Sequence, residues 1–227
     1  MFFMFGSFVY LAQYYQLVAG LSPLNAGLAS IPAAIVFTIA STVTPALISR
    51  MHASHLMAAG MAISAVGFVM LVFASGLVSV VLASIVLSAG FTPVVTLTTG
   101  MIVSAAPPER SGNASAISET SAELGGALGI AVLGSIGTLI YRRQMEGVLA
   151  DVPASSVQAA QATLGGAIET AAALPNEIGT ELVRVGRDAF MMGLDVAAIL
   201  AAVAMVGGAV LVLRMLAHVD APAGAGH

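Results

Sequence analysis

The chain has 227 residues, of which 59% are hydrophobic and 8% are charged, and its formal net charge is −4 at pH 7. A soluble domain carries about 25% charged residues, so this chain is predicted to be a membrane protein. Its acidic balance and the lack of a basic patch exclude a nucleic-acid partner. The sequence contains no cysteine, which excludes disulfides and thiolate metal sites.

Six stretches are apolar and long enough to cross a bilayer, for which a helix needs about 20 residues. They cover residues 2–19, 26–49, 56–75, 78–105, 113–141 and 188–215. Their hydrophobicity is continuous and does not alternate, which is typical of helices and not of the strands of an outer-membrane barrel. The predicted fold class is an all-α integral membrane protein with a six-transmembrane-helix bundle, whose first five helices lie within residues 1–141.

The first predicted helix ends in a cluster of aromatic and amide side chains, Tyr10, Gln13, Tyr14 and Tyr15. Such a cluster is typical of the aromatic belt at a membrane surface. Alternatively, its rings could stack on a flat organic cation, with Tyr10, Gln13 and Tyr14 as candidate cavity residues. The helix starts at Phe2 without a charged flank, so we expect the chain to be the C-terminal part of a longer protein.

Three prolines, Pro32, Pro45 and Pro93, fall inside predicted spans. Each removes one backbone hydrogen bond and favours a kink, which could serve a rocking motion or only shape the helix. Between the second and third spans, His52 and His55 are spaced as metal ligands can be. No third ligand is evident in the sequence, so no metal site is predicted.

A short charged connection precedes the fifth predicted helix. Glu109 suits the first helical turn, where acids interact favourably with the helix dipole. Arg110 could hold neighbouring helices together at this end of the bundle. The sequence shows no nucleophile–base pair and no phosphate-binding loop, so neither an enzyme nor a cofactor is predicted.

Two carboxylates, Glu119 and Glu123, lie inside the fifth predicted helix. Counted from Asn113 they are about 9 and 15 Å along the helix axis, and they lie within about 40° of each other. An intramembrane acid is expected to face the bundle interior or a wet cavity, where burial and mutual repulsion favour protonation of at least one of the two. Alternatively, Glu119 could pair with Arg110 and Glu123 could only hydrogen-bond a neighbouring helix.

The same helix carries a row of small residues, Ser121, Gly125 and Gly129, on a different face. Small residues four apart allow a neighbouring helix backbone to come close. This row is therefore predicted to be a helix-packing surface, separate from the carboxylates.

Residues 142–187 form one long polar loop. Its stretches 155–174 and 177–185 are amphipathic and predict two short helices, a hairpin outside the bilayer. In the sixth helix, Asp188 is expected at the N-cap and Asp195 is a candidate for a cavity-facing carboxylate. Residues 216–227 are expected to form a disordered tail. Arginines lie on both sides of the predicted spans, so charge counting leaves the orientation open.

Three stretches resemble the C-terminal half of a fourteen-helix drug:proton antiporter of the major facilitator superfamily. They are YLAQYYQLVAGLSPLNAGLASIP (10–32), APPERSGNASAISET (106–120) and ELGGALGIAVLGS (123–135). The long loop after LIYRR and the stretch DAFMMGLDVAAILAA are similar to QacA-type multidrug exporters in particular. The similarity covers nearly the whole chain, and the combination of the stretches at these spacings is specific. The loop SRMHASH (49–55), by contrast, holds one arginine and two histidines and is less basic than the family's corresponding loop.

The resemblance implies one half of a major-facilitator fold in a bacterial cytoplasmic membrane, with residues 142–187 extracytoplasmic and the tail cytoplasmic. It also implies proton-coupled efflux of lipophilic or cationic compounds by alternating access, with the N-terminal half missing and Glu119 in substrate recognition. We expect Glu119, Glu123 and Asp195 to bind protons and substrate. The alternatives are a transport-incompetent half-protein, a membrane-embedded partner subunit, or a related uptake carrier.

Overall fold

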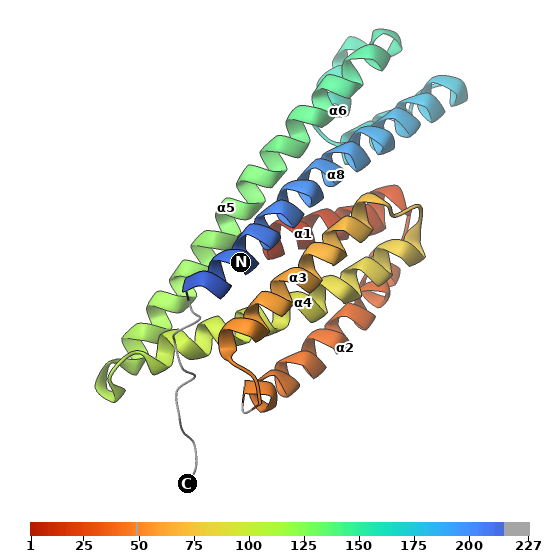
Figure 1. Cartoon of the computed structure of the whole chain (residues 1–227). Coiled ribbons are helices and arrows are strands. Elements are labelled where there is room, and N and C mark those ends of the chain that lie inside the picture. Colours follow the sequence, from red (N-terminus) through yellow and green to blue (C-terminus); the bar gives the residue numbers. More distant parts are fainter. Residues whose placement is uncertain (49, 216–227) are drawn as a thin grey trace.

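The computed structural model describes residues 1–48 and 50–215, and these residues fold into helices joined by short turns (Figure 1). The first part contains α1 (Phe2–Gln13), a π-helical turn η1 (Tyr14–Val18), α2 (Pro23–Ile48), α3 (Ala53–Val72) and α4 (Leu77–Ser104). After a 3-10 turn η2 (Pro108–Arg110) come α5 (Ser111–Met145), a 3-10 turn η3 (Glu146–Asp151), α6 (Ala154–Ala162), α7 (Leu164–Ala171) and α8 (Asn176–Met215). The expected tail 216–227 lies outside the described residues.

Within the described residues, five helices are long and apolar enough to span a membrane, namely α2, α3, α4, α5 and α8. This confirms an all-helical membrane fold, and it differs from the six spans predicted from the sequence. The difference lies in the first stretch, because α1 has only 12 residues before the backbone widens into η1. The segment then turns at Gly20, whose φ of 68° is a left-handed conformation that glycine adopts without strain.

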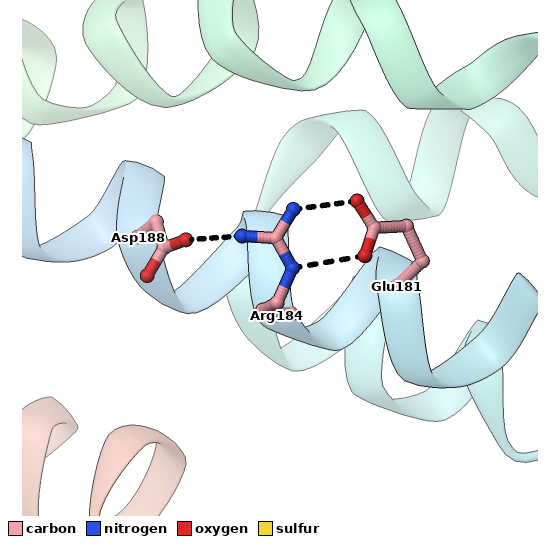
Figure 2. A network of polar contacts seen from close by, with 3 residues as sticks. All are labelled: Glu181, Arg184 and Asp188. Atoms are coloured by element: carbon pink, nitrogen blue, oxygen red, sulfur yellow. Dashed lines mark hydrogen bonds and ion pairs between the residues drawn. The ribbon is translucent and has the colours of Figure 1, made fainter. Parts of the chain in front are cut away.

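The α8 helix begins at Asn176, so residues 177–185 continue directly into the predicted sixth span. The prediction of a separate short helix there is wrong. Arg184 contacts Glu181 and Asp188, which lie one turn away on either side (Figure 2), and such exposed pairs add only a little to helix stability. The same segment also buries Gly179, Leu182 and Gly186. The predicted stretch 155–174 contains two helices, broken at Thr163, whose side chain caps α7 by accepting from the Gly166 N–H.

The α5 and α8 helices are longer than a bilayer requires. With 35 and 40 residues, they measure about 52 and 60 Å, compared with about 30 Å for a hydrocarbon core. Their joined ends, with α6 between them, extend past the ends of α3 and α4 (Figure 1). The charged residues of α8 from Glu177 to Asp188 precede a run that is apolar except for Asp195 up to Arg214.

Close helix contacts at glycines organise the bundle. A Cβ added at Gly60 of α3 would lie 2.7 Å from the Gly90 carbonyl oxygen of α4, so these backbones approach as closely as small residues allow. The α8 helix packs on both α3 and α5. A Cβ added at Gly208 would lie 3.2 Å from the Met61 sulfur, and a Cβ added at Gly193 would lie 3.2 Å from the Gly137 Cα. These contacts fix the relative levels of α3, α5 and α8.

The α1 helix runs parallel to the second part of α5. Phe2 lies against Gly129, and an added Cβ at Gly6 would lie 2.6 Å from Leu133 Cδ1. Further along, the Tyr10 hydroxyl lies against Gly137. The α1 helix therefore covers the part of α5 that follows Gly125 and leaves the part that holds the two glutamates uncovered.

Candidate functional site

Glu119 and Glu123 lie on the uncovered part of α5, and both side chains are exposed. Neither makes a hydrogen bond or an ion pair with any residue that the structure describes. The alternative pairing of Glu119 with Arg110 is therefore absent from the described part of the chain.

The direction of the two acids follows from their neighbours on α5. Gly126, Gly137 and Tyr141 are buried, and at about 100° per residue they lie within about 40° of the mean direction of the acids. The large exposed apolar residues Ile117, Leu124, Leu128, Val132 and Leu139 lie about 120–180° away from that direction, whereas Ile130, which is 41% exposed, lies in it. The acids therefore point to the side of α5 that packs on α1 and α8, and the opposite side suits lipid.

The depth of Glu123 can be worked out from the glycine contacts. Met61 is near the middle of α3 and lies level with Gly208, while Gly193 lies level with Gly137. The 15 residues between Gly193 and Gly208 correspond to about 22 Å of helix. The same distance of about 22 Å, measured from Gly137 toward the start of α5, ends at the level of Glu123. Glu119 lies about 6 Å further toward the start of the helix.

The small residues of α5 lie on the side of α1. Gly129 is buried, and a Cβ there would overlap the backbone carbonyl of Phe2. A Cβ at Gly125 would be 3.5 Å from Met1 Cβ, which is ordinary contact. Ser121 is exposed. Of the predicted row, Gly125 and Gly129 therefore contact α1, whereas Ser121 is exposed.

Asp195 lies apart from the two glutamates. Its Oδ1 atom is buried and has no hydrogen-bond partner among the described residues, although the residue as a whole is half-buried. It is two residues from Gly193, so its level on α8 differs from that of Glu123 by about 18 Å. The structure thus brings Glu119 and Glu123 together and does not bring Asp195 to them.

Asp188 is not an N-cap, because α8 begins twelve residues before it. Its Oδ2 atom accepts a hydrogen bond from Arg184 Nη1 at 3.0 Å, while Arg184 Nη2 and Nε donate to the two oxygens of Glu181 at 2.6 and 2.9 Å (Figure 2). These hydrogen bonds lower the pKa of Glu181 in the charged extension of α8. Arg187 Nε donates to the Leu17 carbonyl oxygen at 3.2 Å and connects α8 to η1.

The aromatic candidates of α1 separate into two groups. Tyr10 and Gln13 line a cavity of about 190 Å³ between α1, α5, α8 and the α6–α7 connection. Tyr14 is buried outside this cavity, with its ring centroid 5.9 Å from that of Tyr15. Sequence reasoning missed two other aromatic walls of the cavity, Tyr141 and Phe190. Tyr141 could have been predicted from the sequence, because its side chain points from the axis of α5 in nearly the same direction as those of Glu119 and Glu123.

The remaining sequence candidates lie outside these sites. Glu109 and Arg110 are exposed in η2, the 3-10 turn before α5. The rings of His52 and His55 lie 5.8 Å apart. Across the described residues, no group of three side chains of the metal-binding types comes together.

Comparison with known proteins places the chain among membrane transporters. Residues 1–130 match the family model described as Major Facilitator Superfamily. The chain is 39% identical over 210 residues to the multidrug efflux pump LfrA of Mycolicibacterium smegmatis, covering 91% of this chain and 42% of that protein. It is 30% identical over 225 residues to the tetracenomycin C resistance and export protein of Streptomyces glaucescens, covering 95% and 42%.

A third relative is the methyl viologen resistance protein SmvA of Salmonella typhimurium, which is 29% identical over 198 residues. The match covers 82% of this chain and 38% of that protein. The chain therefore spans about two-fifths of the length of these three relatives.

Proposed function

The chain belongs to the Major Facilitator Superfamily, and we propose that it forms the C-terminal half of a proton-coupled exporter of lipophilic organic cations in a bacterial cytoplasmic membrane. The family comprises transporters and not enzymes, and the relatives include multidrug efflux pumps. The proposed cargo is supported by the name of one relative, since methyl viologen is an organic dication. We place residues 142–187 on the extracytoplasmic side.

One observation carries the proposal. Two unpaired carboxylates lie on the bundle-facing side of α5, level with the middle of α3, where no described helix covers them. A carboxylate near the centre of a bilayer costs about 3 kcal/mol on insertion scales, and more where it meets lipid tails. A second helical bundle facing this surface across a wet cavity would remove that cost. The N-terminal half of the longer relatives is the proposed source of this second bundle.

The two glutamates would then act by exchanging a proton for a cation. Ionised side chains four residues apart on a helix repel each other, and either a bound proton or a bound organic cation relieves this repulsion. The two ligands therefore compete for the same oxygens. If the site faces the cytoplasm, loss of the proton permits cation binding; once it faces outward, protonation of the carboxylates releases the cation. Alternating access between the two bundles connects these states.

The role of Asp195 is proposed to be separate. Because of its distance from the glutamates and its unpartnered buried oxygen, it can take part in protonation only at the extracytoplasmic end of the bundle. It is not proposed to contact the cation that the glutamates hold.

Ethidium efflux from cells that express this chain together with a matching N-terminal half tests the assignment. We expect Glu119→Gln and Glu123→Gln each to slow efflux at least about tenfold, because the neutral amide can no longer exchange a charge. Glu169→Gln is the matched control, since Glu169 is an exposed glutamate of α7 without an ion pair in the described part of the chain. Unchanged efflux in both α5 variants would remove the site from these residues.

The alternative, a half-protein that does not transport by itself, follows from the share of the relatives that the chain covers. It is tested by expressing the 227 residues alone. The proposal predicts no ethidium efflux from this chain alone, and efflux when a matching N-terminal half is expressed with it. A chain that is a membrane-embedded partner subunit would instead reach the membrane and change the activity of another transporter.

A further inference from the structure

The cavity beside Tyr10 carries an inference about a second ligand site. We propose that it binds the headgroup of an organic cation at the extracytoplasmic end of the bundle, separately from Glu119 and Glu123. The inference takes its ligand class from the proposed function, but binding at this cavity can be measured without transport. Its key lining residues are Tyr10, Gln13, Thr138, Tyr141, Thr163 and Phe190.

Aromatic rings from three helices form the walls. The ring centroids of Tyr10 and Phe190 are 5.8 Å apart and tilted by 55°. The Tyr10 hydroxyl donates to the Leu133 carbonyl oxygen at 2.8 Å, and the Tyr141 hydroxyl donates to the Ala160 carbonyl oxygen at 3.1 Å. Both hydroxyls are therefore used to hold the rings in place. Fixed aromatic faces attract a cation through their negative quadrupole, and they lose little entropy when it binds.

Glycines create the space between these rings. Gly134 and Gly137 of α5 line the cavity, and a Cβ at Gly137 would overlap the Tyr10 hydroxyl. Any larger residue at this position would push Tyr10 into the cavity or away from its carbonyl partner. The hollow is therefore a consequence of the sequence of α5.

The polar lining can hold a cation without a formal charge. The Gln13 amide and the Thr138 hydroxyl are exposed and make no hydrogen bond within the described part of the chain, so their oxygens can accept from a ligand or its water. Among the described residues no carboxylate lines the cavity, so binding would be weaker than at a glutamate and would allow release. Gln13 also precedes the π-helical turn η1, a feature often found at functional sites.

The cavity continues the direction of the two acids along α5. Its lining residue Ile130 is seven residues after Glu123, which is about 10 Å of helix and a rotation of about 20°. Tyr141 has nearly the same direction as Glu123, further toward the α6–α7 connection. A cation that leaves the glutamates for the extracytoplasmic side would therefore meet this cavity on the same face of α5.

The volume limits the ligand. An apolar cavity of about 150 Å³ holds a benzene molecule, so a cavity of about 190 Å³ fits one charged ring or a small quaternary ammonium group. A multi-ring drug would place only one end in it. The expected ligand class is therefore the cationic headgroup of a larger transported compound.

Cysteine protection tests this site, because the chain contains no cysteine. Thr138→Cys introduces a single thiol that lines the cavity, and Thr180→Cys is the matched control on the exposed surface of α8. Each variant of the 227-residue chain is reconstituted in lipid nanodiscs and labelled with N-ethylmaleimide. N-methylpyridinium serves as the cationic probe and toluene as a neutral probe of similar size.

We expect N-methylpyridinium to slow labelling of Thr138→Cys while leaving Thr180→Cys unaffected, and toluene to protect neither. Phe190→Leu in the Thr138→Cys background should raise the half-protecting concentration at least about threefold through loss of one ring face. Equal protection by toluene would show an apolar hollow without cation selectivity. Equal protection of the control cysteine, or a Thr138→Cys thiol that does not react, would also overturn the proposal.

The two sites can be told apart with Glu119→Gln and Glu123→Gln together in the Thr138→Cys background. Unchanged protection supports a separate cavity site, whereas its loss would mean that the cation binds at the glutamates. Because this readout does not depend on efflux, the cavity site can fail while the glutamate assignment stands, and the reverse holds equally.

Discussion

Gly129→Ala tests the contact between α1 and α5 most sharply. A Cβ at position 129 would overlap the Phe2 carbonyl, and its three nearest atoms all belong to the Phe2 backbone. Backbone cannot rotate away as a side chain can, so α1 must move by about 1 Å or more to restore van der Waals contact. This shift would also loosen the neighbouring contact between Phe5 and Gly126, where an added Cβ already lies 2.9 Å from the Phe5 ring.

Overpacking of this kind costs about 1–3 kcal/mol, which corresponds to about 2–12 °C in the thermal midpoint of a chain of this size. Gly134→Ala is the matched control, because an added Cβ at Gly134 of the same helix meets no atom within 4 Å. There the change from glycine to alanine should raise helix stability by up to about 1 kcal/mol. Circular dichroism of the purified chain in detergent measures both midpoints. A midpoint for Gly129→Ala at or above that of Gly134→Ala would refute the packing described for α1.

Further predictions concern the interior and the charged extension of α8. Gly60→Leu should destabilise the chain more than Gly129→Ala. An added Cβ at Gly60 already lies 2.7 Å from the Gly90 carbonyl oxygen, and a leucine brings three further carbons into the α3–α4 contact. Equal thermal midpoints of the two variants would contradict this prediction. Arg187→Gln removes the charged donor to the Leu17 carbonyl and should lower stability by about 1 kcal/mol, while Arg187→Lys should lose less. The Arg184 hydrogen bonds lower the pKa of Glu181, so this pair supports the fold above the ordinary carboxyl pKa and is lost as pH falls through the lowered value. Because the pair is exposed, Glu181→Gln should change the thermal midpoint only slightly at neutral pH and remove that part of the acid dependence; a large change at neutral pH would contradict this.

Much of the fold could be predicted from the sequence, because apolar length alone identifies a membrane helix. Five of the predicted stretches appear as helices long enough to span. The start of α8 could not be predicted from hydropathy, since residues 176–187 mix charged and apolar side chains and their helix continues without a break into the apolar span. The shortness of α1 was missed because a π-helical turn has no hydropathy signal.

The candidate site could be predicted in part. The spacing of Glu119 and Glu123 placed them on one face of a helix, and the structure adds which neighbours that face has. The distance of Asp195 from the two glutamates depends on the level at which α5 and α8 pack against each other. This level cannot be predicted from a single sequence. The cavity could not be predicted for the same reason, because its walls include residues as far apart in the sequence as Tyr10 and Phe190.

Proton release on cation binding tests the central claim most directly. The purified chain, assembled with a matching N-terminal half in weakly buffered detergent solution, is mixed with ethidium while the pH is recorded. The account predicts that wild-type protein releases protons and that the variant with Glu119→Gln and Glu123→Gln together does not. Equal release from the two proteins would show that these carboxylates do not exchange a proton for the cation.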